Sequence, residues 1–377
     1  MKLRVAVITE SFLPQINGVT NSVVQILESL RAEGHEAILI APTAPADTYL
    51  GFPVIRTTKF LFRSFPVALP LLNMTSILRS FKPDVVHVAS PFLLGRQALS
   101  VARRLGIPTV AVYQTDIAGY TARYGLEMLE AASRQTVKNI HRLADVNLAP
   151  TRSTARYLKE MGVTRVAVWG RGVDVARYNP ENRTTAATHH LRDRVAPEHQ
   201  LVVGFVGRLA PEKQVDRFAE LMGLKNTAFL IVGDGPERAR LERQFAGYPV
   251  TFTGALQGEE LATAYAAMDV FVHCGEEETF GQTIQEALAS GVPVVAPASG
   301  GPIALIDDGV NGFLVDPRES KAYRSAVKHI LKRADVRRDM REAARASVEE
   351  KSWANNNAKL FKHYRDLAGA DYQLTAS

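Results

Sequence analysis

The sequence predicts an α/β protein built from two doubly wound, Rossmann-like domains that face a central cleft. Short apolar runs of strand length alternate with helical patterns almost from end to end, which is typical of a parallel sheet covered by helices. This alternation starts again after residue 200. The chain has 377 residues, which is too long for one ordinary domain and suits two of middling size.

The first half opens with an apolar strand at 3–8, followed by a loop and a helical pattern at 19–32. Gly34 stands where a helix of this kind would end. The other elements expected in this half are strands at 37–40, 85–88, 109–112 and 146–148 and helices at 99–105 and 155–161. We expect residues 1–170, joined by a C-terminal helix at 352–377, to form the first domain.

The second domain is expected to comprise residues 171–351. Its predicted elements are strands at 201–206, 229–232, 250–252, 270–272, 292–296 and 313–315 and helices at 214–222, 259–268 and 283–290. Residues 178–200 are polar and lack periodicity, so we interpret them as a linker or surface excursion. The adjacent His189 and His190 could ligate a metal ion, but a solvated loop explains them better.

Composition narrows the class of protein. Hydrophobic residues make up 46% and charged residues 22%, which excludes a disordered chain or a fibre. The single cysteine, Cys274, cannot form an intramolecular disulfide, which favours a reducing compartment. No apolar run reaches the length of a membrane span, so we expect a cytoplasmic protein, either soluble or bound to the inner face of the cell membrane.

Several common nucleotide and hydrolase motifs are absent from the sequence. The loop after the first strand lacks G-x-G-x-x-G, and Gly233-Asp234-Gly235 lacks its third glycine, which disfavours a hydride-transfer enzyme. No P-loop, G-x-S-x-G elbow or zinc-site spacing occurs. The sequence also has no D-x-D, so the usual carboxylate clamp for a metal-bound sugar nucleotide is missing.

The most informative stretch runs from Glu276 to Gly291. An acidic loop passes through Phe280-Gly281 into a predicted helix whose free N–H groups could bind a phosphate. Glu278 and Glu286 are eight residues apart, at most roughly 12 Å at helical rise. This exceeds the roughly 5–9.5 Å of a glycosidase carboxylate pair, so the two glutamates are expected to hold two ends of one elongated ligand.

Two further loops follow predicted strands. Arg208 and Lys213 come after the strand at 201–206, where a parallel sheet binds ligands, and their charges could stabilise a leaving diphosphate. Asn17-Gly18 opens the first helix after the first strand, and such a glycine loop can reach a phosphate or sugar. Taken alone, Arg208 and Lys213 are better explained as two solvated loop cations. The Asn17-Gly18 loop alone is equally well explained by ordinary turn chemistry.

Together these stretches resemble the retaining glycosyltransferases of family four, which have the GT-B architecture. The resemblance rests on Glu278-x7-Glu286 with Phe280-Gly281, on Gly207-Arg208-Leu209 through Lys213, and on 232–236 and 311–315, and it covers nearly the whole chain. Within the family, Asn17-Gly18-Val19-Thr20-Asn21-Ser22 and 84–91 look most like sulfoquinovosyl diacylglycerol synthases and actinobacterial mannosyltransferases that use GDP-mannose.

The resemblance implies a nucleotide-sugar donor bound by the second domain and a lipid or glycolipid acceptor bound by the first. Arg208 and Lys213 would hold the diphosphate, and Glu278 the donor sugar. Glu286 would bind the ribose hydroxyls, and Gly18 would meet the donor from the first domain. The remaining donor-pocket residues would be Phe280, Gly281, Gln282 and Thr283, and the candidates for acceptor or sugar contact are Asn17, Gln114 and Asp116.

The sequence departs from the family pattern at two places. Many relatives have a histidine before Thr-Asp or Thr-His, whereas this chain has Tyr113-Gln114-Thr115-Asp116. Gln114 can form hydrogen bonds but cannot act as an acid or base at neutral pH, so Asp116 is a candidate for part of that role. After Gly300-Gly301, Pro302 and the residues following it stand where relatives often have a glutamate.

The expected reaction is a front-face displacement with retention and without a metal or other cofactor. GDP-mannose is the expected donor, and transfer of glucose, N-acetylglucosamine or sulfoquinovose from a UDP donor stays open. A two-domain sugar-binding protein without activity is the other alternative. No nucleic-acid-binding module is recognisable, so nucleic acid is not an expected partner.

The net charge of +6 is unevenly distributed. Residues 1–170 hold 19 basic and 11 acidic residues, whereas the rest of the chain holds 26 basic and 28 acidic ones. Residues 48–83 contain no acidic residue and intersperse phenylalanines with Arg56, Lys59, Arg63, Arg79 and Lys82. This pattern favours an anionic membrane surface or a lipid-linked acceptor, with buried phenylalanines as the alternative.

Overall fold

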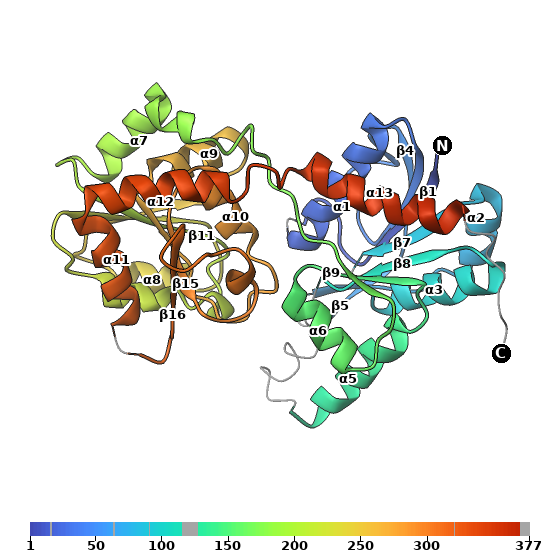
Figure 1. The fold of residues 1–377 in the computed structure, drawn as a ribbon. Coiled ribbons are helices and arrows are strands. Elements are labelled where there is room, and N and C mark those ends of the chain that lie inside the picture. Colours follow the sequence, from blue (N-terminus) through green and yellow to red (C-terminus); the bar gives the residue numbers. More distant parts are fainter. Residues whose placement is uncertain (16, 63–64, 90, 115–126, 320, 370–377) are drawn as a thin grey trace. The chain divides into compact units, whose positions relative to one another are not determined.

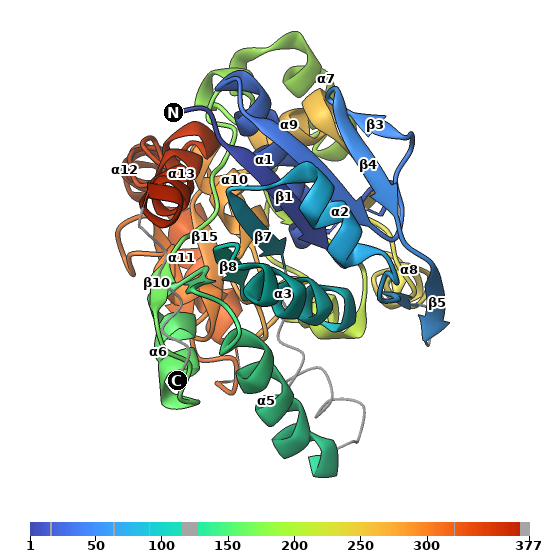
Figure 2. The same ribbon diagram turned by 90° about the vertical axis from the view of Figure 1, so that its right-hand side faces the viewer.

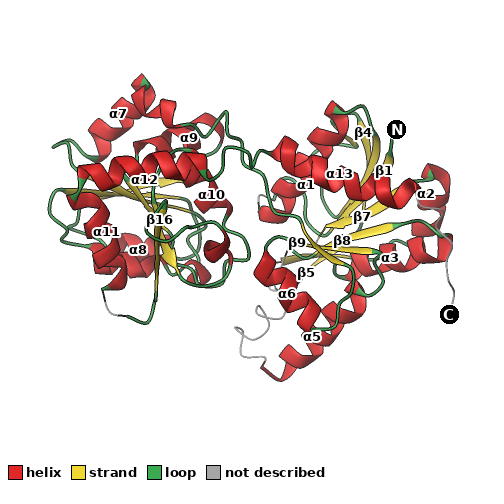
Figure 3. Ribbon diagram, in the orientation of Figure 1, coloured by secondary structure: helices red, strands yellow, loops and turns green. Residues whose placement is uncertain are grey.

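The computed structural model describes residues 1–15, 17–62, 65–89, 91–114, 127–319 and 321–369. The chain divides into two compact units. Unit 1 comprises Met1–Arg171 and Ala354–Ser377, and unit 2 comprises Gly172–Trp353 (Figure 1). Each unit has a largely parallel sheet between layers of helices, as Figure 3 shows, so the predicted pair of Rossmann-like α/β domains is confirmed.

Unit 1 contains an eight-stranded sheet in the order β10-β9-β8-β7-β1-β2-β4-β3. All its neighbours pair in parallel except β3 and β4. The strands are β1 (Arg4–Thr9), β2 (Glu36–Ala41), β3 (Thr48–Tyr49), β4 (Phe52–Arg56), β7 (Val85–Ala89), β8 (Thr109–Val112), β9 (Val146–Ala149) and β10 (Val166–Val168). In a separate two-stranded sheet, β5 (Lys59–Phe62) pairs antiparallel with β6 (Phe65–Ala68).

Helices cover both faces of the unit 1 sheet. On one face α2 and α3 lie side by side (Figure 2), and on the other α1 packs with the last helix, α13. Asn357 of α13 donates a hydrogen bond to the carbonyl oxygen of Gln25 in α1 at 3.0 Å. The helices are α1 (Gly18–Ala32), α2 (Met74–Phe81), α3 (Leu93–Leu105), α5 (Glu127–His141), α6 (Arg152–Glu160) and α13 (Trp353–Gly369).

Unit 2 contains a six-stranded parallel sheet in the order β13-β12-β11-β14-β15-β16. The strands are β11 (Leu201–Val206), β12 (Thr227–Val232), β13 (Val250–Gly254), β14 (Val270–Val272), β15 (Val294–Pro297) and β16 (Gly312–Val315). The α-helices are α7 (Ala186–Val195), α8 (Arg238–Gln244), α9 (Gly258–Ala267), α10 (Gln282–Ala289), α11 (Ala322–Lys332) and α12 (Ala334–Ala346). Short 3-10 helices are η1 (Pro180–Thr184), η2 (Pro211–Lys213), η3 (Val215–Leu221) and η4 (Gly301–Ala304).

The strand order places a switch point in each sheet. In unit 2 the chain leaves β11 toward β12 and β13 and then returns to β14 on the other side of β11. In unit 1, β1 lies in the same way between β2 and β7. Because successive loops diverge at such a point, the carboxyl ends of these strands form the usual ligand-binding edge of an α/β sheet.

One prediction for unit 2 is wrong. Residues 178–200 are not a linker, because η1 and α7 occupy them and α7 buries Leu191 and Val195 against the core. The helical stretch expected at 214–222 corresponds to the 3-10 helix η3 (Val215–Leu221). His189 and His190 are exposed on α7, and no group of three metal-binding side chains occurs in the described part of the chain.

Candidate active site

The ligand-binding edge of unit 2 is built from glycine-containing loops that lie against each other. Gly207 follows β11 and Gly233 follows β12, and the Gly207 N–H donates to the carbonyl oxygen of Val232 at 3.0 Å. A Cβ on Gly233, whose φ is +137°, would lie 1.9 Å from the carbonyl oxygen of Gly207. Glycine is therefore required where the two loops meet.

Arg208 and Lys213 lie in the loop that follows β11. Leu209 is buried between them, and its N–H donates to the carbonyl oxygen of Asp234 at 2.9 Å, which fixes the loop. Arg208 is exposed and forms no ion pair with any residue in the described ranges. Its guanidinium is thus available to an anionic ligand.

Lys213 meets Glu278, one of the two predicted ligand-binding glutamates. The Lys213 Nζ atom lies 2.8 Å from Glu278 Oε2, and His273 Nε2 lies 4.0 Å from the same oxygen. Burial lowers the pKa of His273 to about 4, although the nearby Glu278 carboxylate opposes this shift. His273 is therefore neutral at pH 7, and a lysine and a carboxylate carry the charge here.

The acidic loop is held by backbone contacts with residues 299–301. Gly301 donates its N–H to the carbonyl oxygen of Glu278 at 2.6 Å, and Ser299 donates its hydroxyl to that of Glu276 at 2.8 Å. A Cβ on Gly300 would lie 2.5 Å from the Glu278 carbonyl oxygen. The Gly300-Gly301 pair thus holds in place the loop that contains Glu278. The departure from the family pattern begins only after this pair, at Pro302.

Helix α10 begins at Gln282, directly after Gly281. Gly281 has a φ of +97°, a left-handed conformation that favours glycine, and Phe280 before it is buried. The first turn of α10 has free backbone N–H groups that can bind an anion. Gln282 and Thr283 are half-buried in this turn, and the Gln282 amide donates to the carbonyl oxygen of Gly172 at 3.1 Å.

Glu286 lies one turn further along α10 and is almost fully buried. The Tyr265 hydroxyl donates to Glu286 Oε2 at 2.9 Å. Burial raises the pKa of Glu286 to about 7, and hydrogen bonds from Tyr265 and Gln282 oppose the shift. The carboxyl group therefore changes protonation near neutral pH.

In unit 1 the structure brings Gly18 and Gln114 together through Arg171, a residue that the sequence reasoning missed. Arg171 Nη2 donates to Gln114 Oε1 at 3.3 Å. A Cβ on Gly18 would lie 2.4 Å from Arg171 Nη1, so the guanidinium packs directly on Gly18. The sequence feature that could have identified Arg171 is its position between two glycines, directly after the strand-like run at 166–169.

Gln114 has an unused hydrogen-bond donor. It is 5% exposed, and its Nε2 group has no hydrogen-bond partner among the residues that the structure describes. Because Arg171 occupies Oε1, the amide nitrogen is left to meet a ligand acceptor. Asp116 lies outside the described residues.

Asn17 has a structural use in unit 1. Its Oδ1 accepts hydrogen bonds from the N–H groups of Val19 and Thr20, each at 3.0 Å, and so caps α1.

Glu10 is a second residue of unit 1 that the sequence reasoning missed. It follows β1 and accepts hydrogen bonds from the N–H groups of Phe92 and Gly95 at 2.9 and 3.0 Å. Burial raises the pKa of Glu10 to about 7. Its position directly after a buried strand was the signal that could have identified it.

The basic segment at 48–83 is partly explained by packing. Phe52 is buried, and Phe81 is half-buried beneath the Arg4 guanidinium, 4.7 Å from its ring centre. Arg56 pairs with Asp47 at 2.8 Å, whereas Lys59, Arg79 and Lys82 are exposed. Arg63 and the side chains of residues 60–67 lie outside the described set. Within the described ranges, no helix has the length and apolarity needed to cross a membrane.

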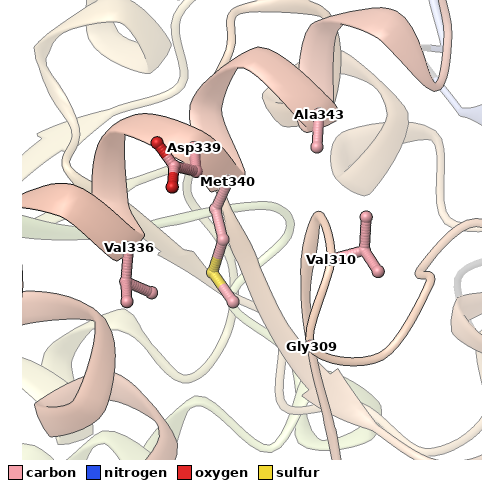
Figure 4. Close-up of a pocket in the computed structure, with 6 residues that line it drawn as sticks. All are labelled: Gly309, Val310, Val336, Asp339, Met340 and Ala343. Carbon is pink, nitrogen blue, oxygen red and sulfur yellow. The ribbon is translucent and has the colours of Figure 1, made fainter.

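A hollow beside α12 has no part in this site. Gly309, Val310, Val336, Asp339, Met340 and Ala343 line it, as Figure 4 shows. None of the candidate site residues is among them, and the lining is mostly apolar.

Comparison with known proteins identifies close relatives over the whole chain. Residues 16–177 match "Glycosyltransferase Family 4", and residues 188–347 match "Glycosyl transferases group 1". The chain is 47% identical to a GDP-mannose-dependent alpha-mannosyltransferase of Mycobacterium tuberculosis, over 97% of each protein. It is 44% identical to the protein of the same name in Corynebacterium glutamicum, over 99% of this chain and 91% of that one.

More distant similarities extend to a plant protein in sequence and to solved structures in fold. The sulfoquinovosyl transferase SQD2 of Arabidopsis thaliana is 32% identical over 95% of this chain and 72% of its own. Sucrose-phosphate synthase from Thermosynechococcus elongatus superimposes with a TM-score of 0.78 at 21% identity, covering 98% of this chain and all of that one. HepE from Anabaena, solved with UDP, gives a TM-score of 0.78 at 19% identity, over 97% and 100% of the two chains.

Proposed function

Because the chain belongs to glycosyltransferase family four and has the GT-B fold, we propose that it transfers α-mannose from GDP-mannose to a glycolipid or lipid-linked acceptor. The observation that carries the proposal is the 44–47% identity, over nearly the full length, to three GDP-mannose-dependent alpha-mannosyltransferases. A phosphatidylinositol dimannoside mannosyltransferase of M. tuberculosis, 27% identical over 95% of both chains, supports a lipid acceptor.

The donor is assigned to the ligand-binding edge of unit 2. Arg208, Lys213 and the N–H groups at the start of α10 supply positive potential for the diphosphate. Glu278 accepts hydrogen bonds from the sugar hydroxyls, and its contact with Lys213 links the sugar position to the diphosphate position. The ribose is assigned to Glu286, and the pocket wall to Phe280, Gly281, Gln282 and Thr283.

The proposed reaction is a front-face displacement without a metal. The bond between the anomeric carbon and the diphosphate oxygen breaks, and its electron pair leaves with the nucleoside diphosphate. The acceptor hydroxyl oxygen bonds to the same face of the carbon, and its proton passes to a phosphate oxygen. Positioning and electrostatic preorganisation supply the acceleration.

The acceptor is assigned to unit 1, whose candidates are Asn17, Gln114 and Asp116, with Gly18 meeting the donor. Exposed Lys59, Arg79 and Lys82 suit an anionic membrane surface and support the proposal that the enzyme acts at the inner face of the cell membrane. Nucleic acid is not a proposed partner.

The test incubates the full chain with a panel of GDP- and UDP-sugars and a bacterial lipid extract, and identifies products by mass spectrometry. We expect a mannolipid from GDP-mannose, with unchanged rate in EDTA and an α-anomer by NMR. Arg208→Ala and Glu278→Gln are expected to lower kcat/KM by about 10²–10³-fold, the usual cost of one transition-state contact.

Arg240→Ala is the matched control, because Arg240 is exposed on α8 and lies outside the proposed site. Products from UDP-sugars alone would overturn the choice of donor. Near-normal transfer by both site variants would overturn the residue assignment.

A further inference from the structure

Unit 2 contains a second cavity, lined by arginines, that the transfer reaction does not use. It measures about 690 Å³, and both Leu201, the first residue of β11, and Asp269, which precedes β14, line it. The arginines in its lining are Arg183, Arg192, Arg337, Arg338, Arg341 and Arg345. Since β11 has six residues, roughly 20 Å of strand separate this cavity from the loop of Arg208.

Backbone carbonyls hold most of these arginines in place. Arg345 donates to the carbonyl oxygens of Val175, Tyr178 and Ala289, each at 3.0 Å. Arg337 donates to the carbonyl oxygen of Leu331 at 3.0 Å. A carbonyl fixes the direction of a guanidinium but does not neutralise its charge.

Arg341 is one of the arginines of this cavity that lack a carboxylate partner. It is half-buried, and its side chain makes no hydrogen bond or ion pair with any residue in the described ranges. Burial and the positive charges of Arg183, Arg192 and Arg337 lower the pKa of Arg341 to about 10, and the Asp269 carboxylate opposes the shift. The guanidinium still carries its proton at pH 7.

The carboxylates around the cavity do not balance its arginines. Asp269 is already held by two of them, Arg183 and Arg192, the latter at 3.0 Å. Glu342 and Glu349 are exposed, and neither lies within 4.0 Å of an arginine side chain in the part of the chain that the structure describes. Asp339 pairs with Arg338 at 3.2 Å, so four carboxylates stand against the six guanidiniums. Among the residues that the structure describes, Arg337, Arg341 and Arg345 have no carboxylate within 4.0 Å.

We propose that this cavity binds a phosphate-bearing anion at a site separate from the transfer centre. Guanidinium groups bind phosphate oxygens through paired hydrogen bonds, and prepositioned arginines lose little entropy in doing so. The volume lies within the usual 300–1,000 Å³ range of small-ligand sites. The phosphate belongs either to a soluble compound or to a phospholipid headgroup, and the proposal does not depend on the identity of the sugar donor.

The test titrates the full chain with inorganic pyrophosphate by calorimetry, at matched ionic strength. An Arg208→Ala/Lys213→Ala background weakens phosphate binding at the proposed donor site, so that the remaining signal reports the cavity. Arg341→Gln in this background is expected to weaken pyrophosphate binding at least tenfold. Arg333→Gln, an exposed arginine outside the cavity, should change it less than twofold.

A second arm measures co-sedimentation with vesicles of phosphatidylcholine alone or with 20% phosphatidic acid. A loss of vesicle binding in Arg341→Gln but not in Arg333→Gln assigns the site to a lipid phosphate, whereas a loss of pyrophosphate binding alone assigns it to a soluble anion. Equal behaviour of Arg341→Gln and Arg333→Gln in both arms overturns the proposal. Folding is checked by Tm without anion, which should rise in Arg341→Gln because charge repulsion is removed.

Discussion

At the scale of single residues, the position of Arg171 depends on the absence of a methyl group at residue 18. Gly18 begins α1 with an ordinary negative φ, so backbone strain does not explain the glycine. The contact that requires it is the Arg171 guanidinium, 2.4 Å from where a Cβ would lie. Arg171 in turn fixes which end of the Gln114 amide is free.

We therefore predict that Gly18→Ala displaces Arg171 and leaves the Gln114 amide without a fixed direction. The expected result is a fall in kcat of about 10–100-fold with little change in Tm, because geometry rather than folding is disturbed. Steady-state kinetics with separate kcat and KM values measure this. Arg171→Gln should produce a similar loss, and the double variant should lose less than the product of the two.

Gly369→Ala is the control, since nothing lies within 4 Å of a Cβ there. If Gly18→Ala matched this control in kcat, Arg171 would have no positioning role.

Glu286 gives a second prediction at this scale. Its pKa is about 7 in the folded protein because of burial, whereas an unfolded glutamate titrates near 4.5. The folded state binds the extra proton between these pH values, so Glu286 contributes stability below about pH 4.5 that is lost as the pH rises through 7. The difference is roughly 3 kcal/mol.

Glu286→Gln is expected to raise Tm relative to the wild type at pH 8, and the gain should disappear at pH 4.5. Thermal unfolding at several pH values measures it, and Glu260→Gln, on the exposed side of α9, is the control. The pKa of Glu10 is also raised to about 7, but Glu10 is present in all variants, so its contribution to the pH dependence of Tm cancels in the comparison. A constant difference at all pH values would contradict the buried charge.

At the scale of elements, the sequence was sufficient to predict a strand where both faces of that strand are buried. In β1, Val5 and Val7 pack into one hydrophobic cluster and Ala6 and Ile8 into another, on the opposite face. Every position of this run is therefore apolar, and a continuous apolar run of this length predicts a buried strand. Residues 186–195 gave no such signal, because α7 buries only a narrow stripe and the rest of its surface is polar and exposed.

The same reasoning explains which parts of the candidate site could be predicted. Arg208, Lys213 and Glu278 lie in the segments that follow β11 and β14, so topology alone predicted them at one edge of unit 2. Arg171 and His273 also follow strands, β10 and β14, but their roles could not be predicted from position, because they depend on contacts with residues 57 and 5 positions away in the sequence. Their contacts with Gln114 and Glu278 required coordinates.

At the scale of the whole molecule, the charge asymmetry between the halves gives the last prediction. The excess of basic residues in 1–170 includes exposed Lys59 and Arg79, and Leu72 nearby is fully exposed. Each cation near an anionic bilayer contributes about 1 kcal/mol, so two reversals should weaken vesicle binding at least 30-fold. Lys59→Glu/Arg79→Glu should therefore remain in the supernatant with phosphatidylglycerol vesicles in 0.1 M salt.

The control is Lys328→Glu/Lys332→Glu, an exposed pair on α11 of unit 2, which changes the net charge equally. We expect this double variant to sediment as the wild type does. An anionic membrane interacts mainly with charges within a Debye length of about 10 Å of its surface, so the total charge of the protein matters less than the charge of the contacting face. Equal loss in both pairs would mean that net charge alone drives vesicle binding. The segment at 48–83 would then be an ordinary solvated surface, its Phe52 and Phe81 placed for packing within unit 1.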